Sequence, residues 1–285
     1  MAVSEKGGFG LPCGFSLLPS KEQSVYEFML SKISDKVGEN RQLTTVVTDF
    51  ESAMYNALME IFPDTDHIGC QYHFRAAIWK NVSDKGLQSF FYNNPLFQEL
   101  IYTLYALAYV PVDDVMRVYE EFIGPLAERY SAEDEDWAAH ATQLNNFGTY
   151  FVNTWIGAKH KTKSGSRRRP LFPLEMWNQY EECLGDGIST NNALESFNRT
   201  WNSMLGPHPN IWKCITSMIK TEADTRRTIM SNACDLDMRD NTGRKDAAAA
   251  LKHKIKSVVE QYENLPTQAY LDKLAHLIAQ KKIDH

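Results

Sequence analysis

The chain has 285 residues, 43% of them hydrophobic and 23% charged, so it holds enough apolar material for a sizeable core and is not intrinsically disordered. We find no apolar stretch long enough to cross a bilayer, and we expect no membrane partner. The net charge of −6 argues against a small nucleic-acid-binding module, which is usually basic. Five widely spaced cysteines predict reduced thiols in the nucleus or cytoplasm, not a disulfide framework.

The N-terminal quarter alternates short strands with helices. The predicted order is a strand over residues 13–20, a helix over 21–37, a strand over 42–50, a helix over 51–62 and a strand over 66–70. Apolar residues recur every three or four positions in the predicted helices, whereas β-branched residues dominate the second strand. This order predicts an α/β unit with parallel strands.

Helical periodicity takes over after residue 73. We expect a helical block that includes a basic loop over residues 158–170, then core helices and a helical tail. The clearest late helix covers residues 187–206, where Ser189, Thr190 and Asn191 are good N-caps. The four predicted regions are residues 1–73, 74–185, 186–232 and 233–285.

Two acids occupy positions where ligands are often bound. Asp49 ends the strand over 42–50, and reactive groups in open α/β sheets lie at the carboxyl ends of strands. Glu195 lies in the first turn of the helix over 187–206. Each acid also has a local interpretation, because an aspartate can cap the helix that follows it and a first-turn glutamate interacts with the helix dipole.

The order of several short segments carries a family resemblance. "TDFESAMYNALMEIFPDTDHIGCQYHFRAAIW" places a helix, Phe-Pro and Cys-x-x-His after Asp49. "STNNALESFNRTWNSMLGPHPNIWKCI" places Thr-Asn-Asn before Glu195 and His-Pro-x-x-Trp after it. Together with "GFSLLPSKEQSVYEFML" and "FPLEMWNQY", these segments resemble the MULE (Mutator-like element) transposase domain over about residues 14–230.

The resemblance implies an α/β, RNase H-like fold of the DDE type, a mixed sheet with flanking helices, interrupted by a large all-helical insertion and followed by a helical tail. In that family two aspartates and one glutamate hold two divalent metals, which implies that Asp49 and Glu195 are catalytic, metal-binding acids for Mg²⁺ or Mn²⁺. The family's first aspartate belongs on a strand upstream of "GFSLL", but residues 1–34 contain no aspartate. We therefore expect an N-terminally truncated or domesticated copy with an incomplete fold, which lacks strand-transfer activity.

Cys70 and His73 form the Cys-x-x-His that the resemblance places near the active site. The pair supplies only half the ligands of a structural zinc site, so we expect no structural zinc. We favour a buried cysteine and a helix-start histidine that shape the fold beside the site, and direct DNA contact stays open.

The basic loop over 158–170 has two interpretations as well. It is a solvated connector, or it binds phosphates through a salt-sensitive contact. Its basic residues are Lys159, Lys161, Lys163, Arg167, Arg168 and Arg169.

Three functions remain open from the sequence. The first is a MULE-type transposase that cleaves and joins phosphodiesters at transposon ends, with self-association left open. The second is a non-catalytic derivative that binds DNA or protein. The third is a remnant without function. Whether the chain is an enzyme depends on the missing first acid.

Overall fold

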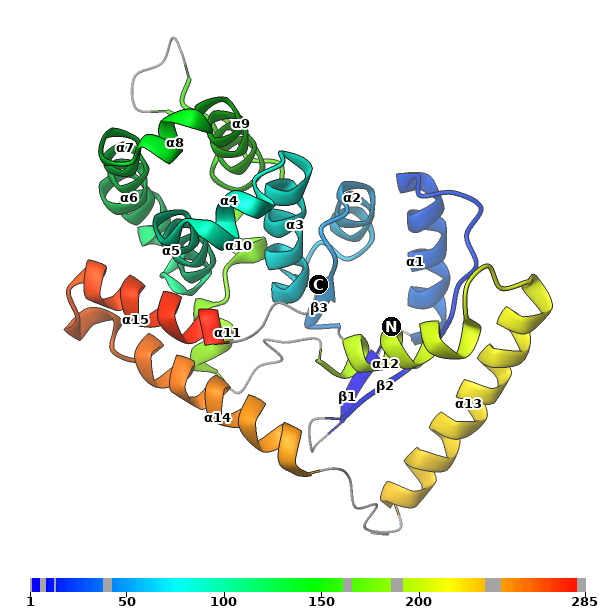
Figure 1. The fold of residues 1–285 in the computed structure, drawn as a ribbon. Helices are drawn as coiled ribbons and strands as arrows, with labels where there is room; N and C mark the ends of the chain where they lie inside the picture. The colour runs from blue at the N-terminus through cyan, green and yellow to red at the C-terminus, as the bar shows by residue number, and fades with distance from the viewer. Residues whose placement is uncertain are drawn as a thin grey trace.

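The protein is mostly helical, with two small sheets of two strands each (Figure 1). The computed structural model describes residues 2–5, 9–12, 14–37, 43–160, 166–185, 192–233 and 242–280. Its buried apolar residues form a large cluster within the helical array and a smaller one in the N-terminal unit. None of the described helices is both long enough and apolar enough to span a membrane.

The N-terminal unit consists of an antiparallel hairpin followed by a parallel β-α-β arrangement. The hairpin pairs Ala2 with Pro12, and the parallel pair sets Thr45 opposite Asp66, so the predicted parallel strands are confirmed. Among the described residues the two pairs are separate and do not form one mixed sheet. The elements are β1 (Ala2–Glu5), β2 (Phe9–Pro12), α1 (Gln23–Val37), β3 (Thr45–Thr48), α2 (Ser52–Ile61) and β4 (Asp66–Gly69).

The predicted strand over residues 13–20 is wrong, because β2 ends at Pro12 and residues 14–20 are irregular. Its apolar side chains serve as anchors for a connecting segment instead. Phe15 stacks on Trp201 with ring centroids 4.9 Å apart, and Leu18 packs against the small cluster between α1 and α2. Apolar side chains of such a run can therefore pack against other elements without the run joining a ladder.

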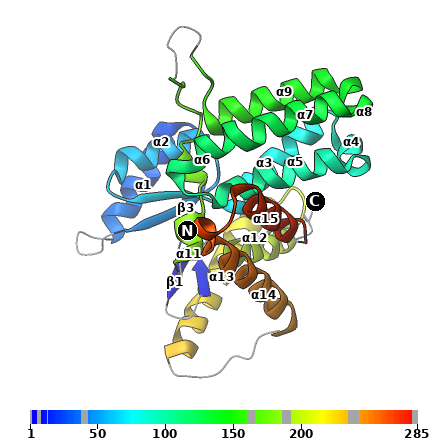
Figure 2. The same ribbon diagram turned by 90° about the vertical axis from the view of Figure 1, so that its left-hand side faces the viewer.

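Helices occupy the stretch that follows β4, where periodicity predicted them, and the first begins at Gln71. Figure 1 looks down this array, and Figure 2 shows it from the side. Two of its segments are π-helical, a form that often marks a local distortion with a function. The elements are α3 (Gln71–Asp84), α4 (Gln88–Asn93), α5 (Pro95–Ala106), η1 (Leu107–Tyr109), α6 (Val112–Val118), η2 (Tyr119–Ile123), α7 (Gly124–Glu133), α8 (Glu135–Ala139), α9 (Ala141–Phe151) and η3 (Val152–Ile156).

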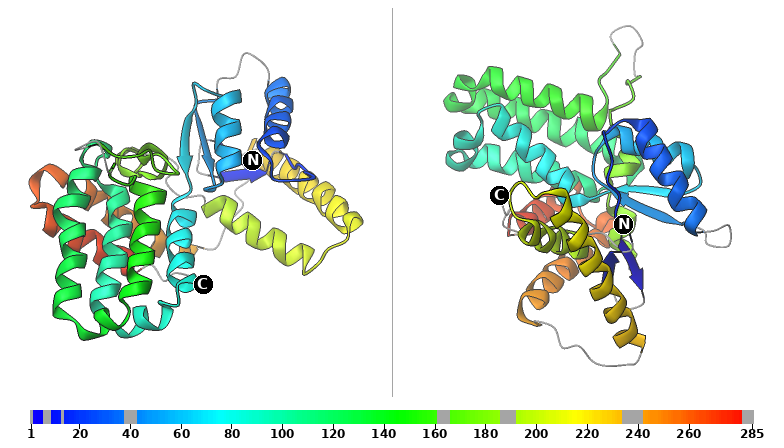
Figure 3. Two further views of the ribbon diagram at one scale, coloured as in Figure 1. Left: turned by 90° about the horizontal axis from the view of Figure 1, so that it is seen from above. Right: turned by 90° about the vertical axis from the view of Figure 1, so that its right-hand side faces the viewer.

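The remaining helices return to both parts of the molecule. α12 and α13 pack against β2, and Figure 3 shows them standing apart from the helical array. α12 begins at Asn192, and the caps expected at Ser189, Thr190 and Asn191 lie outside the described residues. The elements are α10 (Leu174–Trp177), α11 (Tyr180–Leu184), α12 (Asn192–Leu205), α13 (Ile211–Ala233), α14 (Thr242–Val259), η4 (Tyr262–Asn264) and α15 (Thr267–Gln280).

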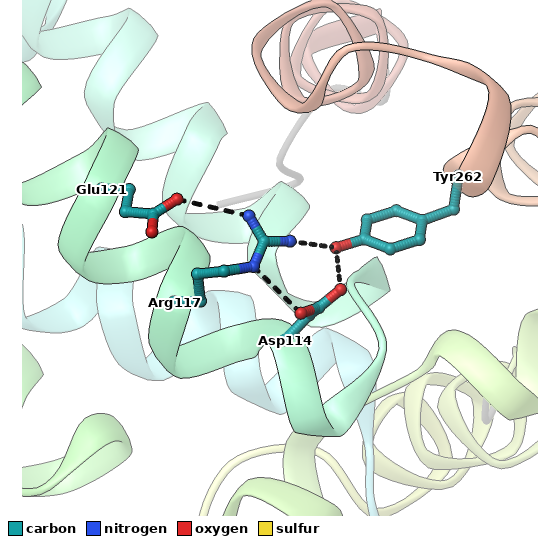
Figure 4. A network of polar contacts seen from close by, with 4 residues as sticks. All are labelled: Asp114, Arg117, Glu121 and Tyr262. Atoms are coloured by element: carbon teal, nitrogen blue, oxygen red, sulfur yellow. Dashed lines mark hydrogen bonds and ion pairs between the residues drawn. The ribbon is translucent and has the colours of Figure 1, made fainter.

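The C-terminal tail is part of the main core. α15 packs along α5, and Tyr270 is fully buried, with its hydroxyl donating to the backbone oxygen of Tyr109. The Tyr262 hydroxyl lies between α6 residues, donating to Asp114 at 2.6 Å and accepting from Arg117 at 3.2 Å (Figure 4). These contacts lower the pKa of the Asp114 carboxyl, with Arg117 as the main cause. The tail therefore closes one side of the helical array.

Candidate functional site

Asp49 lies at the carboxyl end of β3, one residue beyond Thr48. The N-cap of α2 is Glu51, which has an extended backbone and makes no side-chain capping bond. The interpretation of Asp49 as a helix cap is therefore wrong. Glu51 instead accepts from the Tyr26 hydroxyl at 2.9 Å, and burial together with Glu51 raises the pKa of Tyr26 to about 12.

His73 comes from the first turn of α3 and meets the carboxylate of Asp49. The two form an ion pair with 2.9 Å between His73 Nδ1 and Asp49 Oδ1. The parallel pairing explains the meeting, because it brings the ends of β3 and β4 to the same edge. The Cys70 amide extends this pairing by donating to the Thr48 carbonyl at 2.8 Å. Chain segments more than twenty residues apart thus place Asp49 and the Cys-x-x-His together.

The ion pair between Asp49 and His73 changes the pKa of the histidine strongly. The carboxylate of Asp49, followed by the side chain of Cys70, raises the pKa of His73 to about 10 against the opposing effect of burial. His73 is therefore a cation at neutral pH and balances the charge of Asp49. Cys70 is only 2% exposed and occupies the N-cap position of α3 without a side-chain capping bond.

Aromatic packing fixes the backbone beneath Asp49. The Phe50 ring lies edge-on to Trp155 and Phe172, with centroid distances of 4.9 and 5.2 Å. It also lies against Gly69, where an added Cβ would come within 2.2 Å of the ring. The end of β4 accordingly needs a glycine. The end of β3, which precedes Asp49, thus packs against the helical array through Phe50.

Gln179 was not singled out by sequence reasoning, although it lies in the quoted segment "FPLEMWNQY". Its side-chain amide donates to the Gly69 carbonyl at 3.3 Å, and its backbone amide donates to the Ala108 carbonyl at 2.6 Å. No sequence signal marked it, because its burial, at 1% exposure, and its need for hydrogen-bond partners are visible only in the fold. Gln179 joins the end of β4 to the helices around it.

The side chains around Asp49 supply only some of the ligands that a hard divalent cation needs. The Asp49 side chain is 62% exposed and offers carboxylate oxygens, the ligands that Mg²⁺ and Mn²⁺ prefer. The described residues contain no group of three His, Cys, Asp or Glu side chains that could hold a metal ion. Glu195 is in the first turn of α12, but its side chain lies outside the described part of the chain. The proximity of Asp49 and Glu195 therefore stays a prediction.

The described arms of the basic loop meet in an isolated antiparallel β-bridge. Lys159 bridges to Arg167, and the Arg168 amide donates to the Ala158 carbonyl at 2.8 Å. Gly157 has a φ of 91°, and an added Cβ would meet the Arg168 carbonyl oxygen at 2.1 Å. Backbone pairing therefore holds the base of this loop.

The basic side chains of the loop have different environments. Arg167 is only 16% exposed and, together with Lys159, pairs with Glu120, which lowers the pKa of that carboxyl. Arg168 and Arg169 are exposed. The remaining two predicted residues, Lys161 and Lys163, lie outside the described residues.

The N-terminal unit is thus a small α/β unit that presents an acid at a strand end, attached to a helical array. Residues 1–77 match the family model of the MULE transposase domain. This match confirms the resemblance over these residues and suggests a transposase-type function. The segment around Glu195 lies beyond the match. No curated protein and no solved structure matches the chain significantly.

Proposed function

We propose that the chain is a MULE-type transposase derivative that engages DNA, with Asp49 and Glu195 as two of the acids of a DDE site. The observation that carries this proposal is the position of Asp49. It lies at the carboxyl end of a parallel strand, within the segment that matches the family, and it is held by the histidine of the Cys-x-x-His.

His73 is a positioning residue in this proposal. Its Nδ1 contacts one carboxylate oxygen of Asp49 and leaves the second oxygen to face solvent or a ligand. A divalent ion held by Asp49 and Glu195 would activate a nucleophile or stabilise a leaving oxygen on DNA. The protein's own contribution is to fix the carboxylate through Gly69, Phe50 and His73.

DNA contact is proposed for the exposed arginines of the basic loop. Arg168 and Arg169 are available for phosphates, whereas Arg167 is held by Glu120. Among the predicted basic residues that the structure describes, we therefore propose that only this arginine pair contacts DNA. Each phosphate contact adds about 0.9 to the slope of log K against log salt on duplex DNA.

Metal binding tests the site without depending on turnover. Titrated Mn²⁺ should broaden the NMR signals of the His73 side chain in the wild-type chain and leave them sharp in Asp49→Asn. Glu195→Gln should weaken the effect, since it removes the second proposed ligand. Equal broadening in Asp49→Asn would show that Asp49 is not a ligand.

A non-catalytic DNA-binding derivative is the second candidate. Only Asp49 and Glu195 are assigned as acids of the site, and two-metal chemistry needs carboxylates on both ions. This favours the non-catalytic candidate. With Mg²⁺ or Mn²⁺ and a labelled duplex, we expect salt-sensitive binding and no nicking above an Asp49→Ala control. Metal-dependent nicking that disappears in both Asp49→Ala and Glu195→Ala would overturn this candidate and establish the catalytic one.

A further inference from the structure

Helix α13 presents its apolar side chains to solvent. Its buried face carries the small polar residues Ser217 and Thr221. Its outward face carries Trp212, which is 74% exposed, and Ile219, which is 64% exposed. An amphipathic helix normally turns its apolar face toward the core. Because α13 does the reverse, its outward face resembles an interface that has lost its partner.

The outward face has a basic margin. Lys213 and Lys220 are exposed and seven residues apart, so they lie on the same side of the helix. The two arginines further along are neutralised within α13, since Arg226 pairs with Glu222 and Arg227 with Asp224. The outward face thus combines large apolar side chains with few unneutralised cations. Such a face fits a concave apolar protein surface with an acidic residue at its rim better than it fits a phosphate backbone.

Such a concave surface lies between α7 and α9. A cleft of about 690 Å³ is lined by Leu100 and Leu104 of α5 and by residues of η2 and η3. Its rim includes the exposed carboxylate of Glu128. A cavity of about 150 Å³ holds one benzene-sized group, so the cleft has room for several large side chains.

Small residues hold the cleft open. Ala127 of α7 and Gly148 of α9 line its walls, and a Cβ added at Gly148 meets no atom within 4 Å. The α7–α9 cleft and the outward face of α13 are therefore both largely apolar, and the Glu128 carboxylate is opposite in charge to Lys213 and Lys220. Figures 1 and 3 place α13 on the opposite side of the molecule from α7 and α9, so the helix cannot enter the cleft of its own chain.

We propose that the outward face of α13 docks in the α7–α9 cleft of a second copy, and that two copies exchange these contacts reciprocally. One helix face of this kind buries on the order of 400 Å², since one large aromatic side chain such as Trp212 buries roughly 150 to 250 Å². A stable interface buries about 800 Å² on each partner. Reciprocal docking gives each copy two contacts and closes a symmetric dimer. This inference does not depend on the proposed function.

Sedimentation velocity over a range of concentrations tests the dimer. Ile219→Glu places a charge in the proposed contact, and Gly148→Trp fills the cleft. Each should raise the dimer dissociation constant by about thirtyfold, the effect of losing a central interface residue. Gly148→Ala is the matched control, because it leaves the cleft open, and it should dimerise like the wild type. Circular dichroism and thermal melting should show that all variants are folded.

Mixing the two variants distinguishes the proposed contact from other modes of pairing. The Ile219→Glu chain keeps an intact cleft and the Gly148→Trp chain keeps an intact α13, so a mixture should form heterodimers through one good contact. Glu128→Lys combined with Lys220→Glu should also restore association lost in either single variant. A wild-type chain that stays monomeric, or a dimer unaffected by Gly148→Trp, would overturn the proposal. The second result would indicate pairing between two α13 helices.

Discussion

Gly69→Ala tests how tightly the tip of β4 is packed against the candidate site. The new Cβ would lie 2.2 Å from Phe50 Cζ and 2.4 Å from Cε1. Non-bonded carbon atoms prefer about 3.5 to 4.0 Å, so the ring has to move by more than about 1 Å. Trp155 and Phe172 lie edge-on to the same ring, with centroids 4.9 and 5.2 Å away, and they obstruct that movement.

Overpacking of this kind costs about 1 to 3 kcal/mol. A smaller opposite effect of about 0.4 to 1 kcal/mol comes from the reduced freedom of the unfolded chain. We therefore expect Gly69→Ala to lower the free energy of unfolding by about 1 to 2 kcal/mol. Urea denaturation followed by tryptophan fluorescence measures the change, and Trp155 reports directly on the disturbed packing.

Gly148→Ala is the control, since its Cβ meets no atom within 4 Å and the residue lies within α9. Alanine stabilises a helix interior relative to glycine by about 0.5 to 1 kcal/mol. The double variant Gly69→Ala, Phe50→Leu should recover part of the loss by making room for the methyl group. A free energy of unfolding that changes by less than about 0.5 kcal/mol in Gly69→Ala would refute the packing argument.

Three further predictions concern single side chains. Since the folded pKa of His73, about 10, exceeds the ~6.5 of an unfolded histidine, the ion pair should stabilise the protein fully below pH ~6.5 and lose this effect as pH rises through about 10. Because Asp49 is exposed to solvent, the ion pair should contribute only about 1 kcal/mol to the free energy of unfolding. In an NMR titration without metal, Asp49→Asn should return the pKa of His73 toward ~6.5. Arg167→Ala should cost about 1 to 2 kcal/mol of stability because it breaks a half-buried pair, whereas Arg168→Ala should lower only the salt slope of DNA binding. Tyr262→Phe should destabilise the fold by about 1 kcal/mol and raise amide exchange in α14 and α15.

Each of these has a contrary outcome. An unchanged His73 midpoint in Asp49→Asn would show that the carboxylate does not set the charge of the histidine. Equal stability losses in Arg167→Ala and Arg168→Ala would remove the distinction between a structural and an exposed arginine. Normal exchange in the tail of Tyr262→Phe would mean that apolar packing alone holds it.

The local pattern was sufficient for much of the N-terminal unit. The β-branched run before Asp49, the apolar spacing of α1 and α2 and the short strand before Cys70 each depend on near neighbours in the chain. Parallel pairing followed from their order, because a helical crossover between strands favours that geometry. The motifs around Asp49 also predicted the resemblance to the MULE transposase domain, and the match over residues 1–77 confirmed it.

Other features depend on contacts between distant residues. Residues 14–20 have the composition of a strand, but their apolar groups are satisfied by Trp201 and by the α1–α2 cluster. By its local sequence alone Asp49 was better suited to capping a helix, and only the folded chain places His73 beside it. Arg167 and Arg168 are indistinguishable in the sequence, and only the fold separates them, because Arg167 pairs with Glu120 and donates to the Gly157 carbonyl. A charge or an apolar surface acquires its role from its partner, and partners far along the chain are chosen by tertiary packing, not by local propensity.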